Sequence, residues 1–438
     1  MRAISPITPP AGKRPLRCRI FDPFRETPLL AWLFGAGLAV LLEHLLGESF
    51  AALVGLAKVP VLFGLMIILS KPLLFPGALL YVAVIYLLPL VTVALLLARP
   101  ANTAAAALLR LGPAVSVLFH LALFYAVLHF WAEISGYREM TVKFTLIAVL
   151  LTLSLNLING YMGEFSCSHP GFMALGAYGA SIFSLSLFVN DPLFGKALLP
   201  AFLGPWLFPL GLVGGGLLAA LGALLIAIPS FKTRGDYLAI ISLAFLFIVK
   251  SLLENLPFVG GPRGMGSQPD YASLPVVFAW TAMGVWIMNN YVRSTLGRSL
   301  NAIRDDEAAA EAMSVNTRHT KMTAFMFAAF WAGVAGGLFA HMMRFINPAT
   351  FGVQRLAEML AMVYFGGLNS VYGSIVGAVS LNLLGEVLRP LELFKWIFIP
   401  LLLILVMIFR PTGLLAFRDF DAVRLVQPRS RDRQGGAP

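Results

Sequence analysis

The sequence predicts an all-α polytopic membrane protein with about 10–12 transmembrane or half-crossing helices. Of its 438 residues, 59% are hydrophobic and only 12% are charged, whereas an average soluble protein is about 25% charged. Apolar runs of about 20 residues, each long enough to cross a bilayer as a helix, recur along nearly the whole chain. These runs lack the alternating pattern of barrel strands, so helices must satisfy the backbone hydrogen bonds within the lipid.

The apolar runs define candidate spans, bounded by polar residues. In order they are 29–46, 49–70, 73–98, 112–131, 143–162, 170–189, 198–229, 237–257, 274–292, 321–345, 355–388 and 393–409. The run 198–229 is too long for one crossing, and three prolines near its start predict a break there. The run 355–388 contains several glycines and is expected to dip into the membrane and return. Together with the short segment around Pro170, these features predict one or two half-crossing or broken helices.

The net charge of +11 is concentrated in three parts of the chain. Basic residues gather in the first 26 residues, in the loop 293–321 and after Phe409. The positive-inside rule places these parts, and so both termini, in the cytoplasm. The glycine-rich stretch 259–273 is then expected on the outside. Because the basic residues flank membrane spans, their role in orientation explains them and no nucleic-acid partner is expected. The first apolar run follows a long polar segment, unlike a signal peptide, and is expected to be an uncleaved anchor.

Residues that suggest chemistry are few and incomplete. Cys18 lies in the predicted cytoplasmic tail and Cys167 beside a span, so no disulfide is expected. Cys167 and His169 resemble a pair of metal ligands, but no second cluster accompanies them. Ser166 is not in a G-x-S-x-G sequence, so a hydrolase is not indicated. The chain also lacks the phosphate-binding sequence G-x-x-x-x-G-K-[ST]. We expect no metal, no cofactor and no catalysis, and any ATP-driven step requires another polypeptide to bind the nucleotide.

A polar cluster interrupts the apolar sequence between residues 156 and 181. It consists of Glu164, Ser166, Ser168 and His169, and glycines nearby would let helices approach closely. Transporters place polar groups inside a membrane at such helix breaks, which favours a pore-lining role. A tight helix crossing whose polar groups cap the broken ends explains the same residues. Both interpretations stay open.

Two other sites place charge inside apolar runs. Glu43 and His44 lie near a predicted helix end, and we expect them to extend to the membrane interface. Lys250 and Glu254 are four residues apart and can pair on one face of a helix. Because a paired charge costs less in a membrane than a lone one, the second site has a structural explanation.

The loop 297–316 is the longest polar interruption and predicts an amphipathic helix over 299–313, with Ser299 as its N-cap. One face carries four apolar residues at helical spacing: Leu300, Ile303, Ala310 and Met313. The rest of the circumference carries five charged residues: Arg304, Asp305, Asp306, Glu307 and Glu311. Such a helix suits a groove on a partner protein. A helix on the lipid surface or a solvated connector are the alternatives, although the mixed charge signs count against the lipid surface.

Several sequence blocks, in order, resemble the permease subunits of branched-chain amino acid ABC transporters, specifically the larger of the two sister permeases. The blocks are NLINGYMGEFSCSHPGFMALGAYGAS (156–181), TRGDYLAIISLAF (233–245), VGGPRGM (259–265), GRSLNAIRDDEAAAEAMSVN (297–316), AGVAGGLFAHMMRFINPATF (332–351), MVYFGGLNSVYGSIVGA (362–378) and FRPTGLL (409–415). The resemblance covers residues 143 to 415.

The resemblance implies a type II-like ABC importer permease bundle in the bacterial cytoplasmic (inner) membrane. It implies a sister permease, two ATP-binding cassette subunits and a periplasmic substrate-binding protein as partners. It divides the chain into a basic tail with extra spans (1–140), a permease core (141–415) with a cytoplasmic coupling loop (293–321), and a basic cytoplasmic tail (416–438). In the family this loop docks into the ATPase, and the matching residues are Arg304, Asp305, Glu307, Ala308, Ala309, Glu311 and Ala312, followed by Ser314.

Four departures from the family pattern affect the expected turn and substrate. Ser314 stands where the family usually has glycine, so the turn after the helix is expected to be tighter or differently angled. Glu164 and Ser168 replace a more usual glutamine and glycine, and Pro170 replaces a small residue. A branched-chain amino acid is the expected substrate, and urea or short amides are the alternative within the family.

A different class, an ion-gradient-driven secondary transporter, would need ionisable residues inside the bundle. Lys250, Glu254, Glu358 and Glu386 are available for that. Uptake by this chain alone, without an ATPase, would distinguish that class from an ATP-driven importer.

Overall fold

The computed structural model describes residue 24 and residues 26–56, 58–60, 72–191, 194–231 and 237–429. Within these residues, eight helices are long and apolar enough to cross a membrane. The predicted all-α polytopic membrane fold is therefore confirmed. Residue contacts divide the described chain into two units, one made of the residues up to Ile134 with those from Asp421 onward, the other of Ser135–Phe420.

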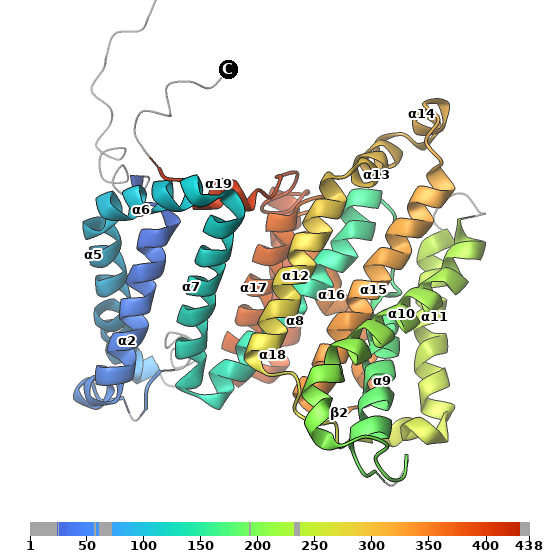
Figure 1. Ribbon diagram of the computed structural model, residues 1–438, viewed down its shortest axis with the longest axis horizontal. Helices are drawn as coiled ribbons and strands as arrows, with labels where there is room; N and C mark the ends of the chain where they lie inside the picture. The colour runs from blue at the N-terminus through green and yellow to red at the C-terminus, as the bar shows by residue number, and fades with distance from the viewer. Residues whose placement is uncertain are drawn as a thin grey trace, which may run out of the picture. The chain divides into compact units, whose positions relative to one another are not determined.

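The regular elements of the first unit, within the described residues, are all helices (Figure 1). Its elements are α2 (Leu29–Leu53), η2 (Pro72–Leu74), α4 (Phe75–Tyr81), the π-helix η3 (Val82–Leu87), α5 (Leu88–Leu96), α6 (Ala98–Leu111), α7 (Pro113–Glu133) and α19 (Ala422–Val426). The predicted break after residue 46 is wrong, because α2 continues through Gly47. Gly47 is instead a close-contact position, where a Cβ would lie 2.9 Å from the hydroxyl of Tyr81. Residues 61–70 of the predicted span 49–70 lie outside the described residues.

Glu43 in α2 is buried, and two tyrosines satisfy its carboxylate. The hydroxyl of Tyr81 donates to Oε1 over 3.4 Å, and that of Tyr86 donates to Oε2. The indole N–H of Trp131 in turn donates to the Tyr86 hydroxyl over 3.2 Å. The expectation that Glu43 extends to the membrane interface is wrong, because these hydrogen bonds replace water for the buried carboxylate. His44 is exposed.

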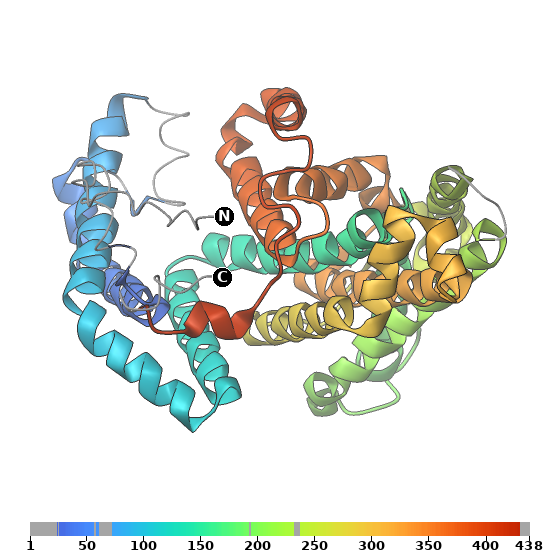
Figure 2. The same ribbon diagram turned by 90° about the horizontal axis from the view of Figure 1, so that it is seen from above.

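The second unit contains the remaining elements. They are α8 (Gly136–Asn156), the π-helix η4 (Leu157–Met162), α9 (His169–Phe188), η5 (Ala201–Leu203), α10 (Gly204–Ser230), α11 (Tyr237–Asn255), η6 (Pro257–Val259), η7 (Gly261–Arg263), β1 (Met265–Gly266), α12 (Leu274–Arg293), α13 (Thr295–Asp305), α14 (Glu307–Ala312), α15 (Thr317–Met343), β2 (Phe345–Ile346), η8 (Pro348–Phe351), α16 (Val353–Gly366), α17 (Val371–Val387), η9 (Arg389–Leu391) and α18 (Glu392–Phe409). Viewed from above, α16, α17 and α18 gather on one side of α8, and α12 runs along its other side (Figure 2).

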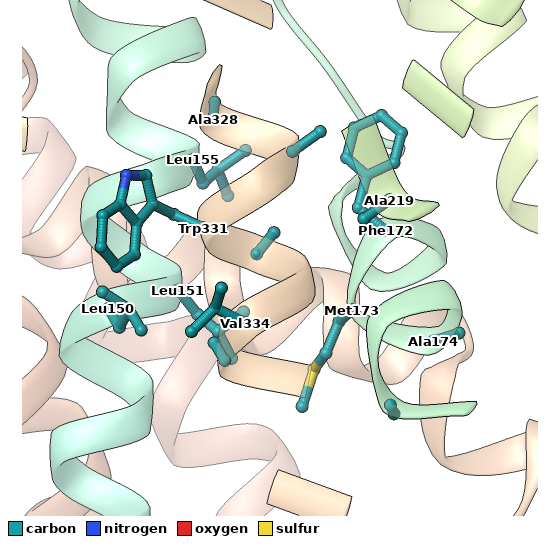
Figure 3. Packing of buried hydrophobic residues seen from close by; sticks show 14 of the residues in the cluster. Leu150, Leu151, Leu155, Phe172, Met173, Ala174, Ala219, Ala328, Trp331 and Val334 are labelled. Carbon is teal, nitrogen blue, oxygen red and sulfur yellow. The ribbon is translucent and has the colours of Figure 1, made fainter. Parts of the chain in front are cut away.

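The core of this unit lies where α8, α9, α10 and α15 pack together (Figure 3). Glycines bring the backbones of α9, α10 and α15 into contact. A Cβ on Gly176 would overlap the carbonyl oxygen of Gly333, and a Cβ on Gly215 would lie 2.6 Å from that of Gly176. These helices approach so closely only because the side chains are absent, as expected for small residues between membrane helices.

The prolines and glycines of the long apolar runs have different effects. The predicted break at the start of 198–229 lies at Pro200, which is extended and precedes the short helix η5, whereas α10 continues through Pro209 without a break. Pro205 lies in the first turn of α10, where a backbone N–H has no partner within the helix, so the missing N–H of proline costs no hydrogen bond. Pro170 likewise begins α9, which is a full helix of 20 residues and not a half-crossing segment. The run 355–388 is broken as predicted, between α16 and α17, where Gly367 has a φ of 128°.

Asn156, the last residue of α8, ties that helix to the break between α16 and α17. Its Nδ2 donates to the carbonyl oxygens of Gly367 (3.3 Å) and Ser370 (3.1 Å) and to Ser374 Oγ (2.7 Å). Its Oδ1 accepts a hydrogen bond from the backbone N–H of Asn369 over 3.2 Å. A single fully buried side chain therefore provides partners for backbone groups of the irregular stretch between α16 and α17.

The chain after α18 pairs with the same break. The N–H groups of Leu414 and Leu415 donate to the carbonyl oxygens of Phe365 and Gly366, over 3.1 and 2.9 Å. The FRPTGLL segment thus covers backbone that would otherwise lack hydrogen-bond partners.

The two ends of the second unit are distinguished by what lies beyond α12 and α15. At one end β1 pairs antiparallel with β2, and β1 precedes α12 while β2 follows α15. At the opposite end α13 and α14 connect these two helices (Figure 1). The stretch 259–273 and the loop 293–321 therefore lie at opposite ends of α12.

Candidate functional site

The loop between α12 and α15 folds into two short helices, so the single helix predicted over 299–313 is wrong. Asp306 breaks it, with an extended backbone (φ −158°, ψ 109°) between α13 and α14. The Asp306 carboxylate caps α14 by accepting a hydrogen bond from the N–H of Ala309 over 3.0 Å. The N-cap of α13 is Ser294, and Ser299 lies inside that helix and donates its hydroxyl to the carbonyl oxygen of Thr295. The sequence pattern alone did not show the break, because aspartate is tolerated inside a helix but stabilises a new N-terminus more.

The break separates residues that were expected on one apolar face. Leu300, Ile303 and Ala310 are buried, but Met313 is 80% exposed. Three small residues of α14, Ala308, Ala309 and Ala312, are exposed with it. We name these four exposed residues the coupling face: Ala308, Ala309, Ala312 and Met313. It is apolar and free of bulky side chains other than the methionine.

The acidic residues of α14 contact the first turns of α15. The Oε1 of Glu307 lies 2.9 Å from the Nζ of Lys321, and Thr317 donates its hydroxyl to the Oε1 of Glu311 over 2.9 Å. Thr317 and Lys321 are four residues apart and so lie on the same face of α15. The two glutamates therefore anchor α14 to α15 while the coupling face stays exposed.

Arg304 and Asp305 lie at the end of α13 and pair with each other, over 2.7 Å between Arg304 Nη2 and Asp305 Oδ1. The guanidinium lies over the ring of Phe417, 5.4 Å from its centroid. The stem of Arg304 covers Gly163, where a Cβ would lie 2.5 Å from Arg304 Cγ. Gly163 has a left-handed φ of 77°, so the chain after η4 needs a glycine both for its conformation and for this contact.

Ser314 follows α14 with a φ of 66°. This is the left-handed conformation that glycine favours. The turn after the helix therefore takes a glycine-like backbone at this position, although the residue is serine. Asn316 then caps α15 by accepting a hydrogen bond from the N–H of His319 over 3.0 Å.

The polar cluster at the helix break is brought together, between η4 and α9. Ser166, Ser168 and His169 are fully buried, and only Glu164 of the four retains some exposure. The Oγ atoms of Ser166 and Ser168 lie 2.9 Å apart, and the N–H of Ser166 donates to the Oδ1 of Asn159 over 3.2 Å. These hydrogen bonds join the segment to η4 and give it a defined conformation.

Neighbouring helices also hold this segment. The N–H of Cys167 donates to the Oγ of Ser242 in α11 over 2.8 Å. Burial raises the pKa of the Cys167 thiol. His169 packs edge-on against Phe172, and within the described chain neither ring nitrogen has a hydrogen-bond partner of normal geometry.

Glu164 differs from the other polar residues of the break because it points toward the loop 293–321. Its Oε1 lies 2.7 Å from the Nζ of Lys321, the same ammonium group that binds Glu307. The role of Lys321 was not recognised from the sequence, where it was only one of several basic residues that support the orientation of the loop. Its position at the start of an apolar run was the available signal, because a lysine there is costly without partners.

Comparisons with known proteins identify membrane permeases as relatives of this chain. The family described as "Branched-chain amino acid transport system / permease component" matches residues 137–409. The high-affinity branched-chain amino acid transport system permease protein LivM of Escherichia coli (strain K12) is 31% identical over 307 residues, which cover 62% of this chain and 68% of that protein. The corresponding protein of Salmonella typhimurium (strain LT2) is 30% identical over the same shares. The autoinducer 2 import system permease protein LsrC of Enterobacter sp. (strain 638) is 27% identical over 153 residues, 34% of this chain and 43% of that protein.

No solved structure matches the chain. The family match spans the helix break, α13, α14 and Lys321. It confirms the resemblance drawn from the sequence blocks, and together with the eight described helices that are long and apolar enough to cross a membrane it indicates a multi-pass membrane transport subunit. The chain belongs to the family of branched-chain amino acid transport system permease components.

Proposed function

We propose that this chain is the membrane-spanning permease of an ATP-driven importer of branched-chain amino acids that depends on a substrate-binding protein. ATP is hydrolysed by two separate cassette subunits, and a sister permease completes the pathway across the inner membrane. The loop 293–321 and both termini face the cytoplasm. The two relatives named for branched-chain amino acid transport are each aligned with this chain over 68% of their own length. This similarity supports branched-chain amino acids as the substrate over urea or short amides.

The observation that carries this proposal is the coupling face. Ala308, Ala309, Ala312 and Met313 form an apolar, small-residue surface on the short helix α14, and all four residues are exposed. An exposed apolar helical surface of this kind fits a groove on a partner protein. A helix lying on lipid would carry basic residues beside its apolar face, whereas the residues that flank this face are Glu307 and Glu311, which bind α15.

The mechanism follows from the connections of α14. Two short, capped helices link α12 and α15, so a force on α14 is applied to the ends of two long helices. We propose that closure of the ATPase dimer moves α13 and α14 together and tilts α12 and α15, which changes the side to which the pathway opens. The buried polar break at 164–169 borders that pathway.

The experiment is uptake of labelled leucine into proteoliposomes that contain the permease pair, the ATPases and the binding protein. Wild type is expected to take up leucine only with ATP and all subunits present. Replacing Ala309 and Ala312 with arginine is expected to lower ATP-driven uptake about tenfold or more, because two bulky charges cannot enter an apolar groove.

The matched control is Ala104→Arg, the same exchange at an exposed alanine of α6 in the first unit. It is expected to leave uptake unchanged. Full uptake by the Ala309→Arg, Ala312→Arg variant would contradict docking through the coupling face. Uptake by this chain alone, driven by an ion gradient without ATPases, would contradict the proposed function itself.

A further inference from the structure

We propose that Lys321 is a positioning residue that transmits movement of α14 to the helix break at 163–168. The inference rests on the proposed function, because it takes α14 as the helix that the ATPase moves. Lys321 lies in the second turn of α15 and joins two segments that are far apart in the chain. It would make one ammonium group the link between α14 and the helix break that joins η4 to α9.

The geometry of this link is that of a shared ion pair. The Nζ of Lys321 lies 2.7 Å from Glu164 Oε1 and 2.9 Å from Glu307 Oε1. The Lys321 side chain is 9% exposed, while those of Glu164 and Glu307 are 26% and 49% exposed. The ammonium is thus the most buried member, and water competes least for it.

Charge makes the link cohesive. Within the described residues, Lys321 is the one cation that forms an ion pair with Glu164 or Glu307. Arg304, another cation of this loop, pairs with Asp305. Without Lys321, two carboxylates held this close would repel each other. The lysine therefore determines whether α14 and the helix break attract or repel.

The segment reached by Glu164 can pass a movement on. Gly163 precedes it with a left-handed backbone, and the N–H of Ser166 donates a hydrogen bond to Asn159 of η4. The N–H of Cys167 is bonded to Ser242 of α11. A shift of Glu164 therefore reaches η4, α9 and α11 together. η4 is a π-helix, a form of helix that is rare and often found at functional sites.

If the ion pairs of Lys321 only held α14 in place, the pair with Glu164 would not be needed. Glu307–Lys321 and Glu311–Thr317 already anchor α14 to α15. The Glu164–Lys321 pair adds nothing to that anchor and instead connects it to the helix break. The two roles are therefore separable by variants that remove one carboxylate at a time.

The probe is the native Cys167, three residues after Glu164, in a chain whose other cysteine is replaced by Cys18→Ser. The complete transporter is reconstituted, and the rate at which N-ethylmaleimide labels Cys167 is compared without nucleotide and with ATP plus vanadate. Uptake of leucine is measured on the same preparations. The variants are Lys321→Met, Lys321→Arg and Glu164→Gln.

Cys18→Ser alone is expected to show a labelling rate that depends on the nucleotide. Lys321→Met and Glu164→Gln are expected to abolish that dependence and to lower uptake about tenfold, within the range of coupling between linked sites. Lys321→Arg, which keeps the charge, is expected to restore most of both. Lys250→Met is the matched control, because within the described residues the ion pair of Lys250 is with Glu254, four residues later in α11, at 3.8 Å.

The possible results separate this inference from the proposed function. A nucleotide-dependent labelling rate that persists in Lys321→Met and Glu164→Gln overturns the role of Lys321, as does a rate without nucleotide dependence in the Cys18→Ser protein. If Lys321→Met does not assemble, Glu164→Gln decides, because it leaves the Glu307–Lys321 anchor in place. Absence of ATP-driven uptake by the Cys18→Ser transporter counts against the proposed function instead.

Discussion

Replacing Asn156 with leucine tests how the buried break between α16 and α17 is stabilised. Leucine has nearly the same size, so the change removes hydrogen bonds more than volume. The amide of Asn156 bonds to the backbone of Gly367, Asn369 and Ser370 and to the hydroxyl of Ser374. In the variant these groups lose a partner in a place that water does not reach.

The size of the effect depends on which groups stay without a partner. The carbonyl oxygen of Ser370 still accepts the hydroxyl of Ser374 over 3.1 Å. The N–H of Asn369 and the carbonyl oxygen of Gly367 lose the bond to Asn156 and become unsatisfied. Each unsatisfied buried group costs about 1–3 kcal/mol, while hydrogen bonds between membrane helices average only about 0.6 kcal/mol. We expect the free energy of unfolding to fall by about 2–3 kcal/mol.

The assay is thermal unfolding of the purified chain in detergent, followed by tryptophan fluorescence at one heating rate. For a unit of this size, the expected loss lowers Tm by about 4–9 °C. Asn255→Leu is the control, because within the described part of the chain Asn255 forms side-chain hydrogen bonds only with Ser251, one turn earlier in α11. It should shift Tm by less than about 1 °C. Equal Tm values for Asn156→Leu and wild type would refute the argument that this side chain satisfies the break.

Three further predictions concern single positions. Ser314→Gly should raise the free energy of unfolding by up to about 1 kcal/mol, because glycine adopts the left-handed conformation without the cost that serine bears; chemical denaturation checks this, and a destabilised variant would contradict it. Gly176→Leu should prevent a stable fold, because its side chain would meet the backbone of Gly333; a monodisperse, full-yield gel-filtration peak would show otherwise. In a Cys18→Ser chain, N-ethylmaleimide should label Cys167 slowly at neutral pH and faster as the pH rises, because burial raises the pKa of the thiol and the thiolate is the reactive form. Labelling at neutral pH as fast as that of a free thiol would count against the burial.

The membrane class and most spans could be predicted because they depend on local composition. Runs such as 112–131 and 143–162 correspond to α7 and to α8 with η4. Breaks were less predictable, because proline acts according to its place in the helix. Pro170 and Pro205 lie in first turns, where they cost no hydrogen bond, and Pro209 is carried inside α10. Gly367 did break its run, because the backbone there is stabilised from outside by Asn156.

The sequence indicated which residues belong to the candidate site, but not which way their side chains point. The loop residues were recognised as a candidate partner-binding helix from spacing and resemblance. The break at Asp306, which leaves Met313 exposed, was not, because a helical pattern continues through it. Sequence spacing also gave no indication that Glu307 faces α15 and not a partner.

By itself, the sequence determined that the chain is a helical membrane protein, that it resembles branched-chain amino acid permeases and that its central loop is amphipathic. Those properties follow from composition, local periodicity and the order of motifs, all of which are visible in the sequence without the folded structure. Only the tertiary structure decided that Lys321 bridges Glu164 and Glu307 and that tyrosines surround Glu43. The reason is physical: the cost of a charge in a membrane depends on which groups packing brings near it, and those groups lie far away in the sequence.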